Sequence, residues 1–291
     1  MDLELKDKVI FVTGGGAGIG EAISTACMDE GAKVVVVSRR SANVQSFLDR
    51  MASERRACGF FEADLQDASL CRKVVNYVEQ VHGRIDGLVN NAGANDGIGL
   101  ADGDPDRFLV SLKSNLVHYY AMAHYALPLL KVSTGSIVNI SSKVALTGQG
   151  GTSAYAAAKG AQLALTREWA AELLPFGIRV NSVLPAEVMT PLYARWVATT
   201  ENPEETLANI VSRIPLGHRM TQRRRNCCHD RIPSFEYKEW SHHRPAPGGG
   251  WRLHSLGSLA YVGSSSPDNK GVAVGRWIID FDNISFASVF H

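Results

Sequence analysis

Short runs with buried-strand character alternate with helical patterns along most of this chain, and this alternation constrains the fold more than any other feature. A β-branched run at residues 9–12 precedes a glycine-rich stretch, a helical pattern and a second apolar run at residues 33–37. Further strand patterns lie at 59–62, 87–90, 136–140 and 179–184, and the helical patterns lie at 17–28, 68–82, 107–130 and 153–174. This alternation indicates an α/β fold with a doubly wound parallel sheet. We therefore expect a ligand at the carboxyl ends of the strands.

Composition excludes several classes of protein. The 291 residues are 45% hydrophobic and 20% charged, which is typical of a soluble globular chain and excludes disorder throughout. The 30 basic and 29 acidic side chains leave a formal charge of +1, so nucleic acid is not an expected partner. No stretch approaches the roughly 18 apolar residues of a membrane span, and residues 1–6 lack the features of a signal peptide. The five cysteines have no framework spacing, so we expect a cytoplasmic protein without disulfides.

A glycine-rich turn, TGGGAGIG at residues 13–20, joins the first strand to the first helix. Glycines at such a turn allow a tight backbone and let N–H groups approach a pyrophosphate at the helix N-terminus. Gly14, Gly18, Ile19 and Gly20 are therefore candidate cofactor-binding residues. The competing interpretation is a tight turn without a ligand.

Further motifs accompany this turn at suitable distances. They are Asp64-Leu65, Asn90-Asn91-Ala92-Gly93, Asn115, Ser142 and the pair Tyr155 and Lys159. Together with the glycine turn they resemble the short-chain dehydrogenase/reductase family over residues 6 to about 222. The resemblance implies a Rossmann fold and a nicotinamide cofactor. Beyond the glycine turn, the cofactor contacts that it implies are Ser38, Arg39, Asp64, Leu65, Asn91, Ala92, Gly93, Tyr155, Lys159, Pro185, Val188 and Thr190.

Tyr155 and Lys159 stand four residues apart on a predicted helix, so both side chains leave the same face. A tyrosine with the ordinary pKa of about 10 is a poor base at neutral pH, but a neighbouring ammonium and an oxidised nicotinamide both favour the phenolate. Tyr155 is therefore the candidate general acid and base. The resemblance implies that Lys159 also holds the nicotinamide ribose, that Ser142 orients the reacting oxygen, and that Asn115 anchors a water that relays the proton. Taken singly, each residue also has an ordinary structural interpretation, such as packing or capping.

The choice of cofactor is made at the tip of the second strand, which reads Ser38-Arg39-Arg40. A carboxylate at this tip would bind the ribose 2′-hydroxyl of NAD, whereas a basic residue would accept the 2′-phosphate of NADP. Because no carboxylate stands there and Arg39 offers a planar fork, we expect NADP to be preferred, with NAD possible. The alternative is two solvated arginines.

Three segments, at 95–100, 147–150 and 185–193, resemble the L-fucose (aldose) dehydrogenase branch of the family. The candidate substrate residues in and near them are Asn95, Lys143, Gln149, Glu187 and Tyr193. Polar groups beside aromatic rings suit a polyhydroxylated small molecule. We expect oxidation of the anomeric hydroxyl of L-fucose or a similar aldose to the lactone. The alternatives are a reductase of 3-oxoacyl or other carbonyl substrates, and a nucleotide-binding protein without turnover.

The pattern changes after Gln222. Residues 223–291 show neither strand nor helical periodicity and lack the family's last helix, last strand and Asp-Gly-Gly ending. Read one nucleotide forward from Arg223 with permitted codons, this segment can give Ala-Glu-Glu-Ile-Ala-Ala-Met-Thr-Val-Phe-Leu-Leu-Ser and finally Val-Asp-Gly-Gly-Tyr, which resembles the missing ending. We therefore hypothesise one extra base near codons 222 and 223. The expected division is a Rossmann domain at 1–222 and an aberrant, poorly ordered tail at 223–291.

The altered tail also bears on ligands and assembly. Cys227 and Cys228 are adjacent and lack the usual gap between zinc ligands, so no metal is expected. The resemblance implies a homodimer or homotetramer if the tail is intact, with the helices of Asn115 and Tyr155 packing between subunits and the last strand forming a second interface. Only the first contact is expected to survive an altered tail. The expected partner is a small-molecule substrate.

Overall fold

The main sheet of the computed structural model has six parallel strands in the order β3-β2-β1-β4-β5-β6. The structure describes residues 4–56, 58–214, 218–222, 254–256 and 259–261. The strands are β1 (Val9–Thr13), β2 (Lys33–Ser38), β3 (Cys58–Glu62), β4 (Gly87–Asn90), β5 (Ser136–Ile140) and β6 (Arg179–Val183). The predicted doubly wound α/β fold is confirmed. The strand order reverses between β1 and β4, and this switch point is where such a sheet binds its ligand.

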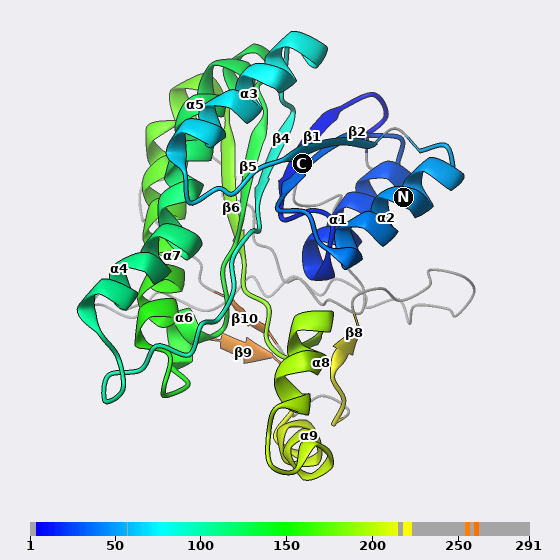
Figure 1. Cartoon of the computed structure of the whole chain (residues 1–291). Coiled ribbons are helices and arrows are strands. Elements are labelled where there is room, and N and C mark those ends of the chain that lie inside the picture. The colour runs from blue at the N-terminus through cyan, green and yellow to red at the C-terminus, as the bar shows by residue number, and fades with distance from the viewer. Residues whose placement is uncertain (1–3, 57, 215–217, 223–253, 257–258, 262–291) are drawn as a thin grey trace, which may run out of the picture.

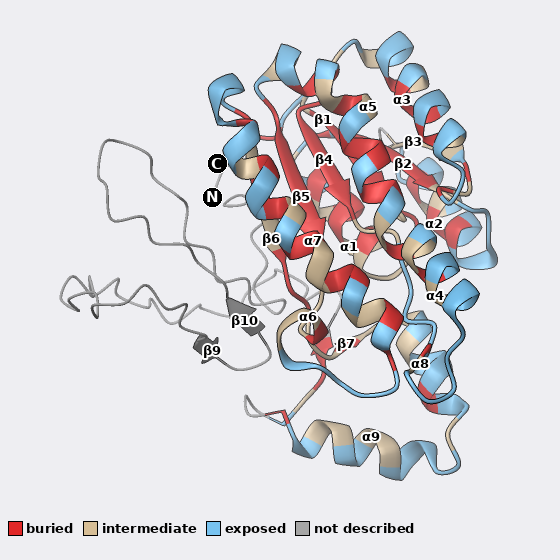
Figure 2. Ribbon diagram, turned by 90° about the vertical axis from the view of Figure 1, so that its left-hand side faces the viewer, coloured by how far each residue is buried: buried red, intermediate tan, exposed pale blue. Residues whose placement is uncertain are grey.

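Helices cover both faces of the sheet (Figure 1). On one face lie α1 (Gly18–Asp29) and α2 (Ala42–Ser53), and on the other lie α3 (Ala68–His82), α5 (His118–Ser133) and α7 (Ser153–Glu172). Strand β1 shows why both faces are apolar: Phe11 packs in the cluster of α3, α5 and α7, while its neighbours Ile10 and Val12 pack in the cluster of α1 and α2. Figure 2 shows the consequence, with buried strands between helices whose outer faces are exposed.

The helix predicted at 107–130 forms three pieces. They are α4 (Pro105–Leu112), the π-helical turn η1 (Lys113–Val117) and α5. A π-helical turn interrupts the 3.6-residue period without a sequence signature of its own, which is why periodicity predicts one continuous helix. The helix predicted at 153–174 corresponds to α7, which stops at Glu172 and is followed by a 3₁₀ turn, η2 (Leu174–Phe176). Helix α2 is not among the predicted elements.

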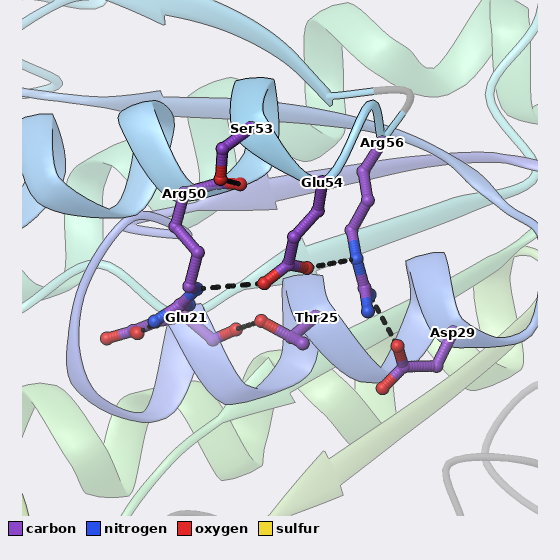
Figure 3. Close-up of polar contacts among 7 residues, drawn as sticks. All are labelled: Glu21, Thr25, Asp29, Arg50, Ser53, Glu54 and Arg56. Atoms are coloured by element: carbon purple, nitrogen blue, oxygen red, sulfur yellow. Dashed lines mark hydrogen bonds and ion pairs between the residues drawn. The ribbon is translucent and has the colours of Figure 1, made fainter.

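Helices α1 and α2 are joined by ion pairs on the molecular surface (Figure 3). Arg50 of α2 contacts Glu21 of α1 at 2.8 Å. Arg56, just beyond α2, bridges Glu54 to Asp29 at the end of α1. Each exposed pair contributes up to about 1 kcal/mol. Their combined effect is to hold α2 in place, and with it the short connection that follows β2.

A smaller set of elements follows the carboxyl ends of β5 and β6. It comprises α6 (Val144–Thr147), β7 (Val188–Met189), α8 (Pro191–Ala198), α9 (Pro203–Ser212) and β8 (Thr221–Gln222). Strands β7 and β8 pair in parallel. Thr190 caps α8 by accepting a hydrogen bond from Tyr193 N at 3.1 Å, and Pro191 opens the helix. Figure 1 shows α6 and α8 at the same end of the sheet, where the ligand is expected.

The predictions for residues 223–291, including the zinc alternative and the poorly ordered tail, lie outside the described residues. The exception is the antiparallel pair β9 (His254–Leu256) and β10 (Leu259–Tyr261). Within the described residues β6 is the last strand on its side of the sheet, and three of its five positions are partly exposed, whereas all of β5 is buried. None of the helices in this described part combines the length and apolar character of a membrane span.

Candidate active site

Ser142, Tyr155 and Lys159 meet beyond the carboxyl end of β5. Ser142 follows that strand by two residues, and its hydroxyl is a polar neighbour of the Tyr155 phenol that lowers the phenol's pKa. The Lys159 ammonium lies 5.4 Å from the centroid of the Tyr155 ring, as the spacing on one helix face requires. The structure thus brings a phenol, a hydroxyl and an ammonium into one site.

Burial controls both titratable groups of this pair. It raises the pKa of Tyr155 to about 12, and the nearby Ser142 hydroxyl opposes that rise. Lys159 is 3% exposed, and burial lowers the pKa of its ammonium to about 7. The ammonium by itself therefore does not produce a phenolate in the cofactor-free site. The predicted phenolate therefore requires the second cationic group as well, the oxidised nicotinamide.

Asn115 lies in the π-helical turn η1 and is fully buried. Its Oδ1 accepts a hydrogen bond from Ala94 N at 2.8 Å, and its Nδ2 donates to Ser111 O at 3.1 Å. The side chain therefore fixes the loop that leaves β4. The Asn115 carbonyl also accepts a hydrogen bond of 2.6 Å from Gln162 Nε2, a contact that no sequence pattern predicts.

The glycine turn leaves the N-terminus of α1 open to an anion. Ala17 stands at the N-cap position and supplies no side-chain acceptor, so the first N–H groups of α1 are not capped by a side chain. Gly14 and Gly18 have φ values of 64° and 61°, which only glycine adopts readily. A Cβ at Gly20 would lie 2.2 Å from the Gly14 carbonyl oxygen. These features fit a pyrophosphate, so the cradle suits the nicotinamide cofactor that the family implies.

Thr13 and Asn91 hold this cradle together. The Thr13 hydroxyl oxygen accepts from Asn91 N at 2.8 Å and from Ala92 N at 3.0 Å. Asn91 Nδ2 in turn donates to the Thr13 carbonyl at 2.9 Å and to the Gly14 carbonyl at 3.3 Å. The Asn91 side-chain amide and the backbone N–H groups of Asn91 and Ala92 are thus all used inside the protein. Thr13 positions this loop and is not among the predicted site residues. Its place at the end of β1, at the start of the TGGGAGIG stretch, is the sequence signal for this role.

The remaining predicted cofactor residues border the same edge of the sheet. Leu65, Pro185 and Val188 are buried, whereas Ile19, Asp64, Ala92 and Thr190 are half-buried and Gly93 is exposed. Asp64 accepts from Gln66 N at 3.1 Å, which shapes the turn after β3. Thr190 approaches the glycine turn from β7, because a Cβ at Gly18 would lie 3.7 Å from Thr190 Cβ. The two ends of the predicted cofactor site are therefore in contact.

The two arginines after β2 have different surroundings. Arg40 Nε contacts Glu62 Oε2 at 2.9 Å, its Nη1 donates to Gln45 at 2.6 Å, and the guanidinium lies over the Phe60 ring. Arg39 is exposed, and its guanidinium makes no hydrogen bond or ion pair with any described residue. Ser38 Oγ donates to the Arg39 carbonyl at 3.2 Å. Of the two cations, Arg39 is thus the one whose donors are available.

Three of the five predicted substrate residues form a cluster. Lys143 Nζ pairs with Glu187 Oε1, and Tyr193 Oη donates to Glu187 Oε2 at 2.9 Å. Burial lowers the pKa of Lys143 and raises the pKa of Tyr193. The other two predicted residues, Asn95 and Gln149, are exposed, and no hydrogen bond among the described residues joins them to this cluster. Asn95 Oδ1 accepts from Gly97 N at 3.1 Å, so that amide closes its own loop.

Comparison with known proteins agrees with this geometry. Residues 8–201 match the family model described as short chain dehydrogenase. L-fucose dehydrogenase of Bos taurus is 35% identical over 213 residues, 72% of this chain and 77% of that protein. The 3-oxoacyl-[acyl-carrier-protein] reductase FabG of Thermotoga maritima is 33% identical over 216 residues, 74% of this chain and 85% of that protein. The crystal structure of Cj0485 dehydrogenase is 44% identical with a TM-score of 0.72, covering 77% of this chain and 85% of that one.

The match to the family model extends over the glycine turn, the loop after β4 and the helix of Tyr155 and Lys159. The relatives are named for dehydrogenase or reductase activity, which is hydride transfer between a substrate and a nicotinamide. The chain belongs to the short-chain dehydrogenase family and is an NAD(P)-dependent oxidoreductase that acts on CH–OH groups.

Proposed function

We propose that this protein oxidises the anomeric hydroxyl of L-fucose or a similar aldose to the lactone, with NADP as the preferred acceptor. The observation that carries the proposal is the Glu187 carboxylate, whose two oxygens are engaged by Lys143 and Tyr193 while the side chain stays 20% exposed. A carboxylate offers about four acceptor positions. Two are used inside the protein, and the others are available for hydroxyl donors.

A sugar fits this environment better than an acyl chain does. It presents several hydroxyl donors to the carboxylate, whereas the ketone of a 3-oxoacyl group presents only acceptors. The Tyr193 and Trp196 rings meet edge to face at 5.3 Å beside Glu187, and Trp196 is 48% exposed. An aromatic surface next to convergent polar groups is typical of a site for a polyhydroxylated ring.

Proton transfer is assigned to Tyr155. In the oxidation direction its phenolate accepts the hydroxyl proton of the substrate, while the Ser142 hydroxyl orients the reacting oxygen. Lys159 holds the cofactor ribose and supplies positive charge beside the phenol. A bound nicotinamide supplies the acceptor for the hydride. Because burial raises the pKa of Tyr155 to about 12, the protonated phenol is the resting form, ready to act as the acid in the reverse reaction.

The sugar assignment is tested by the Glu187→Ala variant in an assay of NADP reduction with a panel of aldoses. Loss of the two hydrogen bonds to this charged group should lower kcat/KM for L-fucose about 100-fold. Glu79→Ala, which changes an exposed carboxylate on α3, is the matched control and should leave kcat/KM unchanged. Unchanged sugar oxidation by Glu187→Ala would remove Glu187 from substrate binding. Faster turnover of 3-oxoacyl esters than of any sugar would favour the reductase alternative, which the similarity to FabG supports.

The choice of cofactor is tested by Arg39→Ala, with Arg40→Ala as the control. Arg39→Ala removes an exposed, charge-assisted contact to the 2′-phosphate. The KM for NADP should therefore rise about 10-fold. The KM for NAD should change little, because NAD lacks that phosphate. Arg40 is already bonded to Glu62 and Gln45, so its removal should affect the two cofactors alike. Equal effects of Arg39→Ala on NADP and NAD would rule out the assignment.

We also propose a homodimer through the helices that carry Asn115 and Tyr155. Exposed apolar side chains support it: Leu109 of α4, Val117 of η1 and Tyr120 of α5 are 55%, 44% and 56% exposed. Light scattering on the purified chain tests it, and a monomer would overturn it.

For the tail, the hypothesis of one extra base stands as a proposal, and sequencing the source DNA across codons 220–226 decides it.

A further inference from the structure

Gln162 is a polar side chain at the centre of the site to which the proposed chemistry assigns no role. It lies three residues beyond Lys159 on α7 and is 0% exposed. Residues with this spacing share one face of a helix, so Gln162 stands directly beside the lysine. Burying an amide is unfavourable unless its donor and its acceptor both find partners. Its partners therefore show what the amide does.

Both ends of the amide are bonded to catalytic elements. Gln162 Nε2 donates to the Asn115 carbonyl at 2.6 Å, and Gln162 Oε1 accepts from Lys159 Nζ at 3.2 Å. The orientation of the amide is fixed chemically, because a flipped amide would turn its oxygen to a carbonyl and its NH₂ group to an ammonium. One side chain thus links the ammonium to the π-helical turn η1.

The Lys159 ammonium has two other hydrogen-bond acceptors, which lie at different distances from it. Lys159 Nζ donates to the Ile140 carbonyl at 2.8 Å, while its contact with Tyr119 Oη is long at 3.5 Å. Gln162 and Ile140 therefore set the direction of the ammonium. The third donor, weakly engaged with Tyr119, is the one available to a cofactor ribose.

We propose that Gln162 is a positioning residue of the active site, whose amide couples the Lys159 ammonium directly to the backbone at Asn115, where the family resemblance predicts a water. This inference rests on the proposed role of Tyr155 and Lys159. A covalently tethered amide, unlike a water, cannot exchange or leave when the ribose binds. The ammonium consequently keeps its orientation toward the Tyr155 ring throughout turnover.

The titratable groups that face Lys159 are few. Tyr155 comes from α7, and Tyr119 and His118 come from α5. Burial lowers the pKa of His118 to about 4 and raises the pKa of Tyr119, so both are neutral at pH 7. Because these neighbours carry no formal charge at pH 7, the pKa of Lys159 should respond measurably to the acceptor oxygen of Gln162.

The test measures the pKa of Lys159 in the cofactor-free full chain by NMR of ¹³C-labelled lysine side chains, with the Lys159→Met spectrum identifying the signal. Gln162→Leu removes an acceptor from the charged form and should lower the pKa of Lys159 by about one unit. Gln162→Glu keeps an oxygen acceptor and adds negative charge, so it should raise that pKa. In turnover, Gln162→Leu should lower kcat about tenfold with a smaller change in the KM for the sugar.

Thr166→Val is the matched control on the next turn of α7. Thr166 Oγ1 is also buried and bonded, donating to the Gln162 carbonyl at 2.7 Å and accepting from Asn139 at 2.9 Å, but it does not touch Lys159. It should reduce stability without moving the pKa of Lys159. Opposite pKa shifts in the leucine and glutamate variants support the proposal.

An unchanged pKa in Gln162→Leu, or a shift equal to that of Thr166→Val, overturns the proposal and leaves Gln162 a structural residue. If the leucine variant does not fold, Gln162→Glu decides alone, and the absence of an upward shift overturns it. Failure of the proposed function has a different signature: Lys159→Met would then still transfer hydride, whatever the titration shows.

Discussion

Replacing Thr13 by valine removes the hydroxyl that joins the glycine turn to the loop after β4 and that also donates to the Val89 carbonyl at 3.3 Å. Valine has the shape of threonine, so packing at this fully buried position is kept while the hydroxyl is lost. Two backbone donors, Asn91 N at 2.8 Å and Ala92 N at 3.0 Å, then lose their acceptor. An unsatisfied buried donor costs about 1–3 kcal/mol. Both residues are half-buried, which allows water some access, so we expect a loss of about 2–4 kcal/mol in the free energy of unfolding.

The assay is urea unfolding of the full chain followed by circular dichroism, with Thr13→Ser as the control. Serine keeps the acceptor oxygen and removes one methyl group, which corresponds to about 1 kcal/mol. Cofactor affinity should follow the same order, because the segment from Asn91 to Gly93 borders the predicted nicotinamide site. The reasoning fails if valine costs less than about 0.5 kcal/mol, the range of an ordinary surface substitution, or if serine costs as much as valine.

Two further predictions concern the same site. Burial lowers the pKa of Lys159 from 10.5 to about 7, so between these values the unfolded chain binds more protons than the native protein, and the free energy of unfolding should rise with pH by up to about 1.4 kcal/mol per unit. Urea unfolding at pH 7 and 9 measures that rise, and Lys159→Met should abolish it. The same rise in Lys159→Met as in the unmodified protein would assign the pH dependence to another group. Gly20→Ala should abolish cofactor binding measured by fluorescence titration, because the added Cβ would lie 2.2 Å from the Gly14 carbonyl oxygen. The control, Gly160→Ala on α7, meets nothing within 4 Å, and equal losses in both variants would contradict the steric argument.

Local sequence determines the frame of this protein. Apolar runs of four to six residues separated by helical periods determine a parallel sheet, because only such a sheet is buried on both faces. The glycine turn determines where an anion can approach, since glycine alone adopts the φ of 64° at Gly14 without strain. The spacing of Tyr155 and Lys159 places both on one helix face whatever the rest of the chain does. Each of these conclusions depends on contacts within a few residues, which a sequence displays directly.

The tertiary structure decided how polar groups are paired, because the partners come from distant parts of the chain. Arg40 and Glu62 are 22 residues apart, and the pairing of β2 with β3 brings them together, which leaves Arg39 available. Lys143 and Glu187 are 44 residues apart and meet because the loops after β5 and β6 lie side by side. The π-helical turn leaves no periodic trace, yet it presents the Asn115 carbonyl to Gln162 across 47 residues. Buried polar atoms need hydrogen-bond partners, and in this protein the tertiary packing determines which distant residues supply them.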